Sequence, residues 1–242
     1  MKKAARWRWH LAGVLAVLAL LPAQSWGLTI FQAHFNGSLL TAEGQAPAVA
    51  ENVQFAPGRC ATQGIMVTDE TKLQYPALGN VSLYQGTFSV WIKPVGWRGG
   101  VPPKTRYIFN WNPVKTNKQN AIQFVQNGRQ TVNVLLRGDD GSYLQPCARP
   151  SLVFSDGVWV HLAAAWSAFD RVLQLYVNGK LVEEKRRDEP LTVGQTGELF
   201  SIGGVGAYSV DGIIDEVVIS DRCLTPEELM AQFRKPIAAY SD

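Results

Sequence analysis

The chain has 242 residues, 46% of them hydrophobic, and carries 23 basic against 20 acidic side chains with three cysteines. This length suits one domain with a hydrophobic core large enough to fold without disulfide bridges. Because no Cys-x-x-Cys or His-x-His pair occurs, the sequence excludes the usual ligand clusters for transition metals.

The N-terminus has the order of an export signal. Four basic residues precede an apolar run over residues 11–21, and small residues follow up to Gly27. This order predicts a signal peptide over residues 1–27, cleaved after Gly27 or, as a second choice, after Ser25; the alternative is an uncleaved anchor. The apolar run is shorter than the roughly 20 residues that span a bilayer.

Cleavage leaves a mature domain over residues 28–242, without a membrane span, that is secreted or held in the periplasm or cell envelope. The leader holds four basic and no acidic residues, so this domain has 19 basic against 20 acidic residues, a net charge of −1. The charge is unevenly divided, because no acid occurs in the 68 positions between Glu70 and Asp139. That basic span contains Lys72, Lys93, Arg98, Lys104, Arg106, Lys115, Lys118, Arg129 and Arg137.

Short strands at short spacing predict an all-β domain. Residues 28–35 form the first expected strand, which ends at an Asn36-Gly37 turn, and residues 53–55 and 64–67 continue the series. Residues 86–94 alternate, so that Phe88, Val90 and Ile92 share one face, which we expect to be core. Residues 121–125 and 131–136 predict a hairpin across Asn127-Gly128, with one apolar and one mixed face.

The clearest strand pattern lies between Val158 and Val182. Residues 158–166 and 171–177 both alternate, and Asn178-Gly179 then turns the chain into residues 180–182. Asn-Gly between two alternating segments is the strongest short-range hairpin signal, so we predict a central antiparallel hairpin here. A helix from about Pro226 to Phe233 should follow, because Thr225 and Glu228 have the spacing of a capping box.

These motifs, taken in order from Phe31 to Phe233, resemble the pentraxin and laminin-G-like branch of the concanavalin A-like sandwiches. The features that carry the resemblance are Trp159-x-His161, the strand into Asn178-Gly179, Ile202-Gly203-Gly204, and the run from Asp211 to Leu229. The resemblance implies a two-sheet antiparallel jelly-roll sandwich with a short C-terminal helix.

The sequence also departs from the pentraxin pattern. The pentraxin core disulfide would join positions that match Trp91 and Ala163, neither of which is cysteine. The loop over residues 202–209, which matches the pentraxin calcium and phosphocholine site, contains no carboxylate. The resemblance therefore implies the scaffold, whose members mostly bind carbohydrate or protein, without a double-calcium site.

No row of catalytic carboxylates is evident in the sequence. Asp215 and Glu216 are neighbours on one expected strand and should point to opposite faces, while the other paired acids lie in turns or at the helix start. His161 is expected to be a core histidine. We therefore expect a binding module without catalytic residues, and a glycan-cleaving hydrolase or lyase on the same fold is an alternative.

Two further sites are expected. Cys60 and Cys147 lie in proline-containing loops and are candidates for a disulfide, while Cys223 should be a buried thiol. The resemblance also implies one structural calcium ion at Asn36, Gly37 and Asp215. In the alternative interpretation, Asp215 accepts hydrogen bonds from a neighbouring turn.

The basic span suggests where a ligand binds. Two loops within it combine an aromatic side chain with a basic one, and a sugar ring can stack on tryptophan while a cation meets a carboxylate or sulfate. Trp97, Arg98, Trp111 and Lys115 are therefore predicted to bind an acidic polysaccharide or envelope glycan.

Other outcomes remain open for this charge pattern. Nucleic acid would also fit the charge, but export argues against it. Acidic residues from other strands could lie among the basic ones, so that no basic patch forms. Both tryptophans could also be buried, in which case neither would contact a ligand. A third function class is a protein-interaction or envelope-structural domain.

Overall fold

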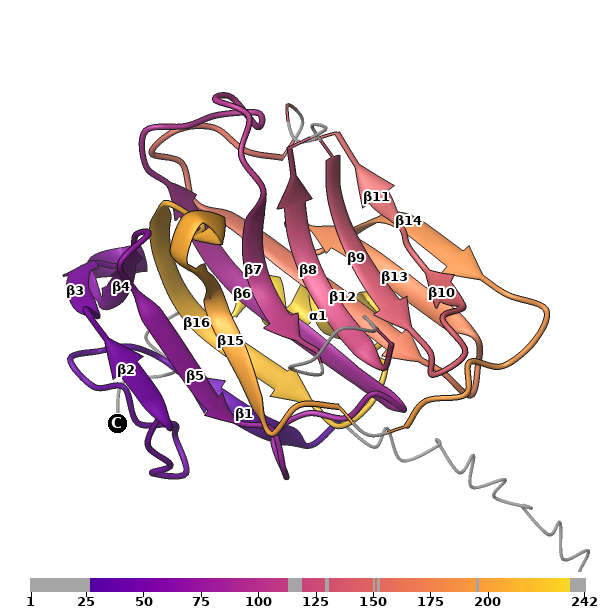
Figure 1. Ribbon diagram of the computed structural model, residues 1–242. Coiled ribbons are helices and arrows are strands. Elements are labelled where there is room, and N and C mark those ends of the chain that lie inside the picture. The colour runs from indigo at the N-terminus through magenta and orange to yellow at the C-terminus, as the bar shows by residue number, and fades with distance from the viewer. Residues whose placement is uncertain are drawn as a thin grey trace, which may run out of the picture.

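The computed structural model describes residues 27–112, 119–128, 131–149, 151, 153–194 and 196–235. Two antiparallel sheets of eight strands each face one another (Figure 1). Sheet A contains β1 (Thr29–Ala33), β3 (Gln54–Pro57), β4 (Gln63–Val67), β6 (Gln85–Pro94), β12 (Val160–Ser167), β13 (Val172–Val177), β14 (Lys180–Arg186) and β16 (Gly212–Ser220). Sheet B contains β2 (Val49–Glu51), β5 (Lys72–Pro76), β7 (Arg106–Trp111), β8 (Ala121–Asn127), β9 (Thr131–Arg137), β10 (Tyr143–Leu144), β11 (Cys147–Ala148) and β15 (Leu199–Val205).

The strand order is that of a jelly-roll sandwich. Sheet A runs β14-β13-β12-β6-β16-β4-β3 with β1 also paired to β16, and sheet B runs β10-β9-β8-β7-β15-β5-β2 with β11 also paired to β9. Among the described residues, the helical segments include η1 (Arg59–Ala61), η3 (Gly206–Tyr208) and α1 (Pro226–Arg234). The predicted fold class, an all-β two-sheet sandwich with a short C-terminal helix, is confirmed.

The core lies between the two sheets. On β6 the alternation is as predicted, because Phe88, Val90 and Ile92 are all buried in the main hydrophobic cluster. Phe109 of β7, in the opposite sheet, packs against Phe88 with ring centroids 4.6 Å apart. Each fully buried side chain of this size stabilises the fold by about 1.5–3 kcal/mol, so the inward faces of the strands dominate the stability.

Helix α1 covers part of the outer face of sheet A. Thr225 Oγ1 accepts a hydrogen bond from the Glu228 backbone N–H and the Glu228 carboxylate accepts one from the Thr225 N–H, which confirms the predicted capping box. Leu229 of the helix is buried against outward-facing alanines of β12, and the Phe233 ring stacks on Trp91 of β6 at 5.5 Å. α1 is the one α-helix among the described residues, and it lies on sheet A.

The two predicted hairpins have different outcomes. β8 and β9 pair directly across Asn127, as the sequence predicted. β13 and β14 are also joined by Asn178 and Gly179, whose φ angles of 49° and 73° are those that this turn requires. The expectation of a central hairpin is wrong, however, because β14 is an edge strand and the centre of sheet A is formed by β12, β6 and β16.

The predicted leader lies almost entirely in residues 1–26, outside the described residues. Within the described ranges, no helix has the length and apolar character to cross a membrane.

Candidate functional site

A row of polar side chains crosses the outer face of sheet B. Strand register places Gln74 of β5 opposite Ser201 of β15, Ser201 opposite Asn110 of β7, and Asn110 opposite Gln123 of β8. Gln74 Nε2 donates to Ser201 Oγ at 2.9 Å, and Gln123 Nε2 donates to Asn110 Oδ1 at 2.8 Å. We call these four residues the amide row.

The amide row lies on the outer side of sheet B because its neighbours in sequence face the core; Gln74, Asn110 and Gln123 are half-buried there, whereas Ser201 is buried. Leu73 and Tyr75 flank Gln74, and both are completely buried between the sheets. Each amide has two donor hydrogens and an acceptor oxygen, and only part of this capacity is used within the row. In the described part of the chain, Asn110 Nδ2 and Gln123 Oε1 make no hydrogen bond to another residue, so both remain for a ligand.

A second row lies about 6.5–7 Å away, two residues further along β8 and three further along β7, where a register shift adds one residue. Register aligns Tyr107 of β7 with Val125 of β8 and Asn133 of β9, and Gln145 donates to Asn133 at 3.1 Å. The ring of Tyr208, which is 55% exposed, meets the ring of Tyr107 edge to face at 5.8 Å. Burial, and secondarily Tyr208, raises the pKa of Tyr107, so its hydroxyl stays protonated and can donate a hydrogen bond.

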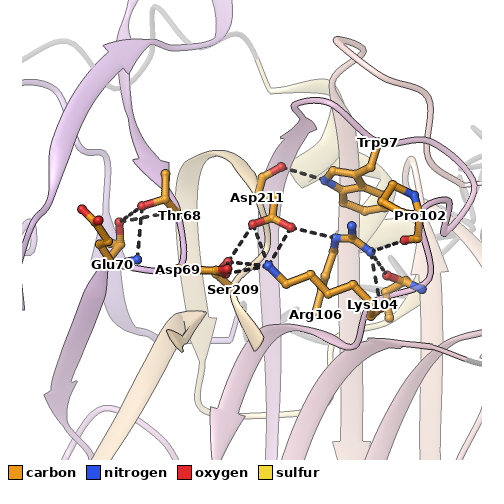
Figure 2. Close-up of polar contacts among 11 residues, drawn as sticks. Thr68, Asp69, Glu70, Trp97, Pro102, Lys104, Arg106, Ser209 and Asp211 are labelled. Atoms are coloured by element: carbon orange, nitrogen blue, oxygen red, sulfur yellow. Dashed lines mark hydrogen bonds and ion pairs between the residues drawn. The ribbon is translucent and has the colours of Figure 1, made fainter. Parts of the chain in front are cut away.

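Charged side chains meet at one end of this face, as Figure 2 shows. Lys104 Nζ lies 2.6 Å from Asp69 Oδ1, 2.8 Å from each carboxylate oxygen of Asp211 and 3.1 Å from Ser209 Oγ. We call these four residues the rim cage. The hydrogen bond from Lys104, followed by that from Ser209, lowers the pKa of Asp69, so the carboxylate stays ionised.

Arg106 contacts the rim cage from the interior of the protein. Its side chain points inward, with Nη1 donating to Gln126 Oε1 at 2.9 Å and Nε 3.4 Å from Asp211 Oδ2. Its guanidinium carbon lies 4.2 Å from the centroid of the Trp97 ring, and Trp97 Nε1 donates to the Asp211 carbonyl at 2.7 Å (Figure 2). Arg106 is therefore a structural residue, although it belongs to the basic span.

Trp97 and Trp111 were predicted to lie on the surface and contact a ligand, but both side chains are buried. Trp97 is only 3% exposed and Trp111 only 7%, and each indole N–H is bonded to a backbone carbonyl, of Asp211 and Gly197 respectively. Neither ring has a face open to a sugar. Arg98 is exposed, as the prediction requires, whereas Lys115 lies outside the described residues.

Acids from elsewhere in the sequence interrupt the basic span. Lys104 and Arg106 pair with Asp211, and Lys72 is 3.5 Å from Glu51 on the neighbouring strand. Arg137 is different, because its guanidinium lies over the Tyr143 ring at 5.6 Å and makes no ion pair with an acid in the described ranges. Arg137 lies two residues beyond Leu135 on the outer side of β9, where it pairs with Ala121 of β8, two residues before Gln123 of the amide row.

The predicted calcium residues lie close together, around the turn over residues 58–63. Asp215 is fully buried and accepts hydrogen bonds from the Arg59 N–H at 2.9 Å, the Thr62 hydroxyl at 3.2 Å and the Glu216 N–H at 2.9 Å. Asn36 Oδ1 accepts from the Gln63 N–H at 3.0 Å, and Gly37 completes the turn after β1.

These bonds are the ones that the alternative interpretation expects, in which Asp215 accepts hydrogen bonds from a neighbouring turn. They also occupy oxygen lone pairs that calcium, which takes six to eight oxygens, would need. No group of three or more His, Cys, Asp or Glu side chains in the described ranges is arranged to hold a metal. A structural calcium ion at Asn36, Gly37 and Asp215 stays a prediction.

Asp215 and Glu216 do not point to opposite faces as predicted. The register of β16 shifts between Asp215 and Val218, and Glu216 has a φ of 51°, which is the geometry of a β-bulge. The bulge turns both carboxylates to the outer side of sheet A, where Glu216 Oε2 lies 2.8 Å from His34 Nδ1. Both acids are buried and bonded to neighbouring segments, which favours a structural role for them.

The predicted disulfide between Cys60 and Cys147 is also wrong, because all three cysteines are free thiols. Cys60 lies in η1 beside β4, whereas the Cys147 N–H donates to Glu183 of β14. β4 and β14 lie near opposite ends of sheet A, five strand spacings or roughly 24 Å apart. A disulfide needs Cα atoms within about 7 Å.

The free thiols should differ in reactivity. Burial raises the pKa of Cys223 to about 11, so its thiolate is scarce at neutral pH, whereas Cys60 and Cys147 are exposed. We expect a thiol reagent at pH 8 to label Cys60 rapidly, Cys147 more slowly because burial and the Glu183 carboxylate raise the pKa of its thiol, and Cys223 last or only after unfolding. Peptide mapping without reductant checks this, and a Cys60–Cys147 linked peptide would contradict it.

The amide row and the tyrosine pair were not predicted from the sequence. Their signal was the mixed face of the segments 121–125 and 131–136, in which polar residues alternate with core residues. Individually these are ordinary strand residues, and only the non-sequential strand order β5-β15-β7-β8 brings them together.

Comparisons with known proteins agree with this architecture. A laminin G family model, described as Concanavalin A-like lectin/glucanases superfamily, matches residues 68–230. A comparison with curated proteins finds no match.

Two solved structures illustrate the likeness in fold. One is domain 4 of AbnA, an extracellular GH43 arabinanase from Geobacillus stearothermophilus, in complex with arabinotriose; its TM-score is 0.65 at 18% identity, covering 86% of this chain and 99% of that one. The other is the binding domain of botulinum neurotoxin DC in complex with SialylT, with a TM-score of 0.62 at 16% identity, covering 85% of this chain and 50% of that one. At these identities the likeness shows the shared fold alone.

Proposed function

Because the chain belongs to the concanavalin A-like lectin/glucanases superfamily, we propose that it is a non-catalytic carbohydrate-binding module whose site is the outer face of sheet B. The observation that carries this proposal is the amide row with the tyrosine pair beside it. This face presents hydrogen-bonding groups and aromatic surface together, from the strands of sheet B and the adjoining segment η3.

The chemistry of this face suits a sugar. Each sugar hydroxyl is both a donor and an acceptor, and so is each amide, so Asn110 and Gln123 can bond neighbouring hydroxyls in either direction. An aromatic ring offers an apolar surface to the C–H face of the sugar, which is the role we assign to Tyr107 and Tyr208. The distance between the two rows, about 6.5–7 Å, is close to the size of one sugar ring.

We further propose that the preferred glycan is acidic, such as an acidic polysaccharide or an envelope glycan. Arg137 supports this proposal, because its cation lies on the same face without an acidic partner among the described residues. Arg98 stays a predicted second contact. Guanidinium groups bind carboxylates and sulfates through paired hydrogen bonds, so one arginine beside the row would select charged chains.

Cleavage of the glycan is less well supported than binding. Glycosidases place two carboxyl groups on either side of the scissile bond, about 5–10 Å apart. The eight strands of sheet B contain a single acidic residue, Glu51, on the edge strand β2. The amide row therefore has hydrogen-bonding capacity but no acid and base pair.

Export of the protein remains part of the proposal. It rests on the predicted signal peptide over residues 1–27, and the name of the similar arabinanase describes that protein as extracellular. We propose that the mature chain acts outside the cytoplasm, as a secreted, periplasmic or envelope protein.

Substitutions on the proposed face test the function. We expect Tyr107→Ala and Gln123→Ala each to weaken binding to an immobilised uronate polymer roughly tenfold, which corresponds to about 1.4 kcal/mol. Arg137→Gln should weaken binding to the uronate polymer but leave binding to a neutral polymer unchanged. Retention of the wild type should also fall as salt rises, because added salt shortens the Debye length. Affinity electrophoresis or calorimetry measures all three variants.

Phe169→Ala is the matched control, because Phe169 is an exposed aromatic residue in the turn between β12 and β13 of sheet A. It should bind like the wild type. Loss of binding in the control together with normal binding in Tyr107→Ala would move the site to sheet A. If no glycan binds but an envelope protein co-purifies, the protein-interaction alternative replaces this proposal.

A further inference from the structure

The rim cage surrounds the Lys104 ammonium with oxygen. Four oxygens lie within 3.1 Å of Nζ, namely Asp69 Oδ1, Asp211 Oδ1, Asp211 Oδ2 and Ser209 Oγ. An ammonium group has three hydrogens, so four short contacts exceed the number of linear hydrogen bonds that it can donate. The arrangement resembles the oxygen shell of a bound cation more than an ordinary surface ion pair.

The composition of the cage leads to the same interpretation. Carboxylate and hydroxyl oxygens are the ligands that hard cations take, and Lys104 is a compact point charge at their centre. Asp69 and Asp211 together carry two negative charges, which the cage balances with Lys104 and with Arg106 at 3.4 Å. Without the lysine, two carboxylates and a hydroxyl would face one another around one partly exposed space.

We propose that the rim cage is a cation site that the protein fills with its own Lys104, and that this internal cation positions Tyr208 in the carbohydrate-binding face. The second part rests on the proposed function. Lys104 is thus a positioning residue, and its removal should convert the cage into a site for a divalent cation such as Ca²⁺.

The connection to Tyr208 is short and covalent. Ser209 directly follows Tyr208, and its hydroxyl donates to Asp69 Oδ1 at 2.6 Å and lies 2.8 Å from Asp211 Oδ1. The adjacent backbone is closely packed, because a Cβ added at Gly204 would lie 2.3 Å from the Tyr208 carbonyl oxygen. The segment can therefore move only as a unit. The bonds that hold Ser209 in the cage thus also fix the ring of Tyr208 against Tyr107.

Chemical rescue tests the proposal. We expect Lys104→Ala to lower the melting temperature and to weaken glycan binding roughly tenfold, because the two carboxylates then repel and release Ser209. About 10 mM calcium should raise the melting temperature of this variant by roughly 3–10 °C, as for a weak extracellular calcium site, and should restore glycan binding. Lys104→Met should lose binding without recovery, because its side chain still fills the cage.

Three controls test whether the calcium response belongs to the rim cage. Lys104→Ala combined with Asp211→Asn should show no rescue by calcium, because a ligand is lost. Lys185→Ala removes an exposed lysine that pairs with Glu183 on β14, at 2.7 Å, and should behave like the wild type. The wild-type response to calcium is subtracted from each variant, since a calcium ion at Asp215 would stabilise all of them equally.

The outcomes separate this proposal from the proposed function. If Lys104→Ala melts like the wild type and gains no calcium response, the cage is not a cation site. If calcium stabilises the variant but binding stays normal throughout, the cage does not position Tyr208. If the wild type binds no glycan at all, the proposed function fails, while the melting experiments still decide whether Lys104 occupies a cation site.

Discussion

Replacement of Arg106 by methionine should lower the free energy of unfolding by about 1–3 kcal/mol, because buried hydrogen-bond acceptors lose their donor, while Asp211 keeps Lys104 as its ion-pair partner. Arg106 is 1% exposed, and burial lowers the pKa of its guanidinium while Asp211 raises it. Besides Gln126, its Nη1 contacts the carbonyls of Lys104 at 3.3 Å and Pro102 at 3.4 Å. Methionine fills much of the same space but leaves these acceptors without a donor.

Urea unfolding at neutral pH measures this effect. The matched control is Arg98→Met, which removes the same charge eight positions earlier from an exposed side chain and should change stability by less than about 0.5 kcal/mol. Equal unfolding midpoints for the two variants would mean that the contacts of Arg106 contribute nothing beyond its charge.

His161 should make the protein lose stability in acid. Burial, and secondarily the nearby Arg59, lowers the pKa of His161 to about 3, against 6.5 in an unfolded chain. The folded state thus holds the ring neutral, and Nδ1 is buried without a hydrogen-bond partner in the described structure. Because the unfolded state binds the proton more tightly, the contribution of His161 is complete above about pH 6.5 and is lost as the pH falls toward 3.

The expected slope is about 1.4 kcal/mol per pH unit, or roughly 4–5 kcal/mol over the whole interval. His161→Phe keeps an aromatic ring in contact with both Trp91 and Phe233 but cannot bind a proton. The difference in unfolding free energy between wild type and variant, measured in urea from pH 7 to 4, should change by this slope. Asp215, whose pKa is raised to about 6 by burial, titrates in both proteins and cancels in the difference. If the unfolding free energies of wild type and variant changed equally with pH, the lowered pKa of His161 would be contradicted.

Much of the fold follows from local sequence. The alternation of Phe88, Val90 and Ile92 predicts the inner face of β6, and Thr225 with Glu228 predicts the start of α1, because both signals depend on residues close together in the chain. The β-bulge at Glu216 was missed for the opposite reason. Glu216 is not a residue type that signals positive φ, and the bulge depends on pairing with distant strands.

The binding face could not be predicted from the local sequence, because it depends on contacts between distant segments. Trp97 lies in a glycine- and proline-rich loop, which is typical of an exposed segment, yet its indole is fixed by a carbonyl 114 positions away. Likewise, Lys104 appeared unpaired within the basic span, while its partners Asp69 and Asp211 lie beyond both ends of that span. Such contacts are set by strand order and loop packing rather than by spacing along the chain.

The most direct test of the central claim is the footprint of a bound oligosaccharide in hydrogen–deuterium exchange. With a uronate oligomer that binds the protein, we expect slower exchange in β5, β7, β8 and β15, the strands that carry the amide row, and in the segment of Tyr208. Exchange in α1 and β13 should be unchanged, since both belong to the opposite side of the sandwich. Protection confined to α1 or to the strands of sheet A would contradict the assignment of the binding face to sheet B.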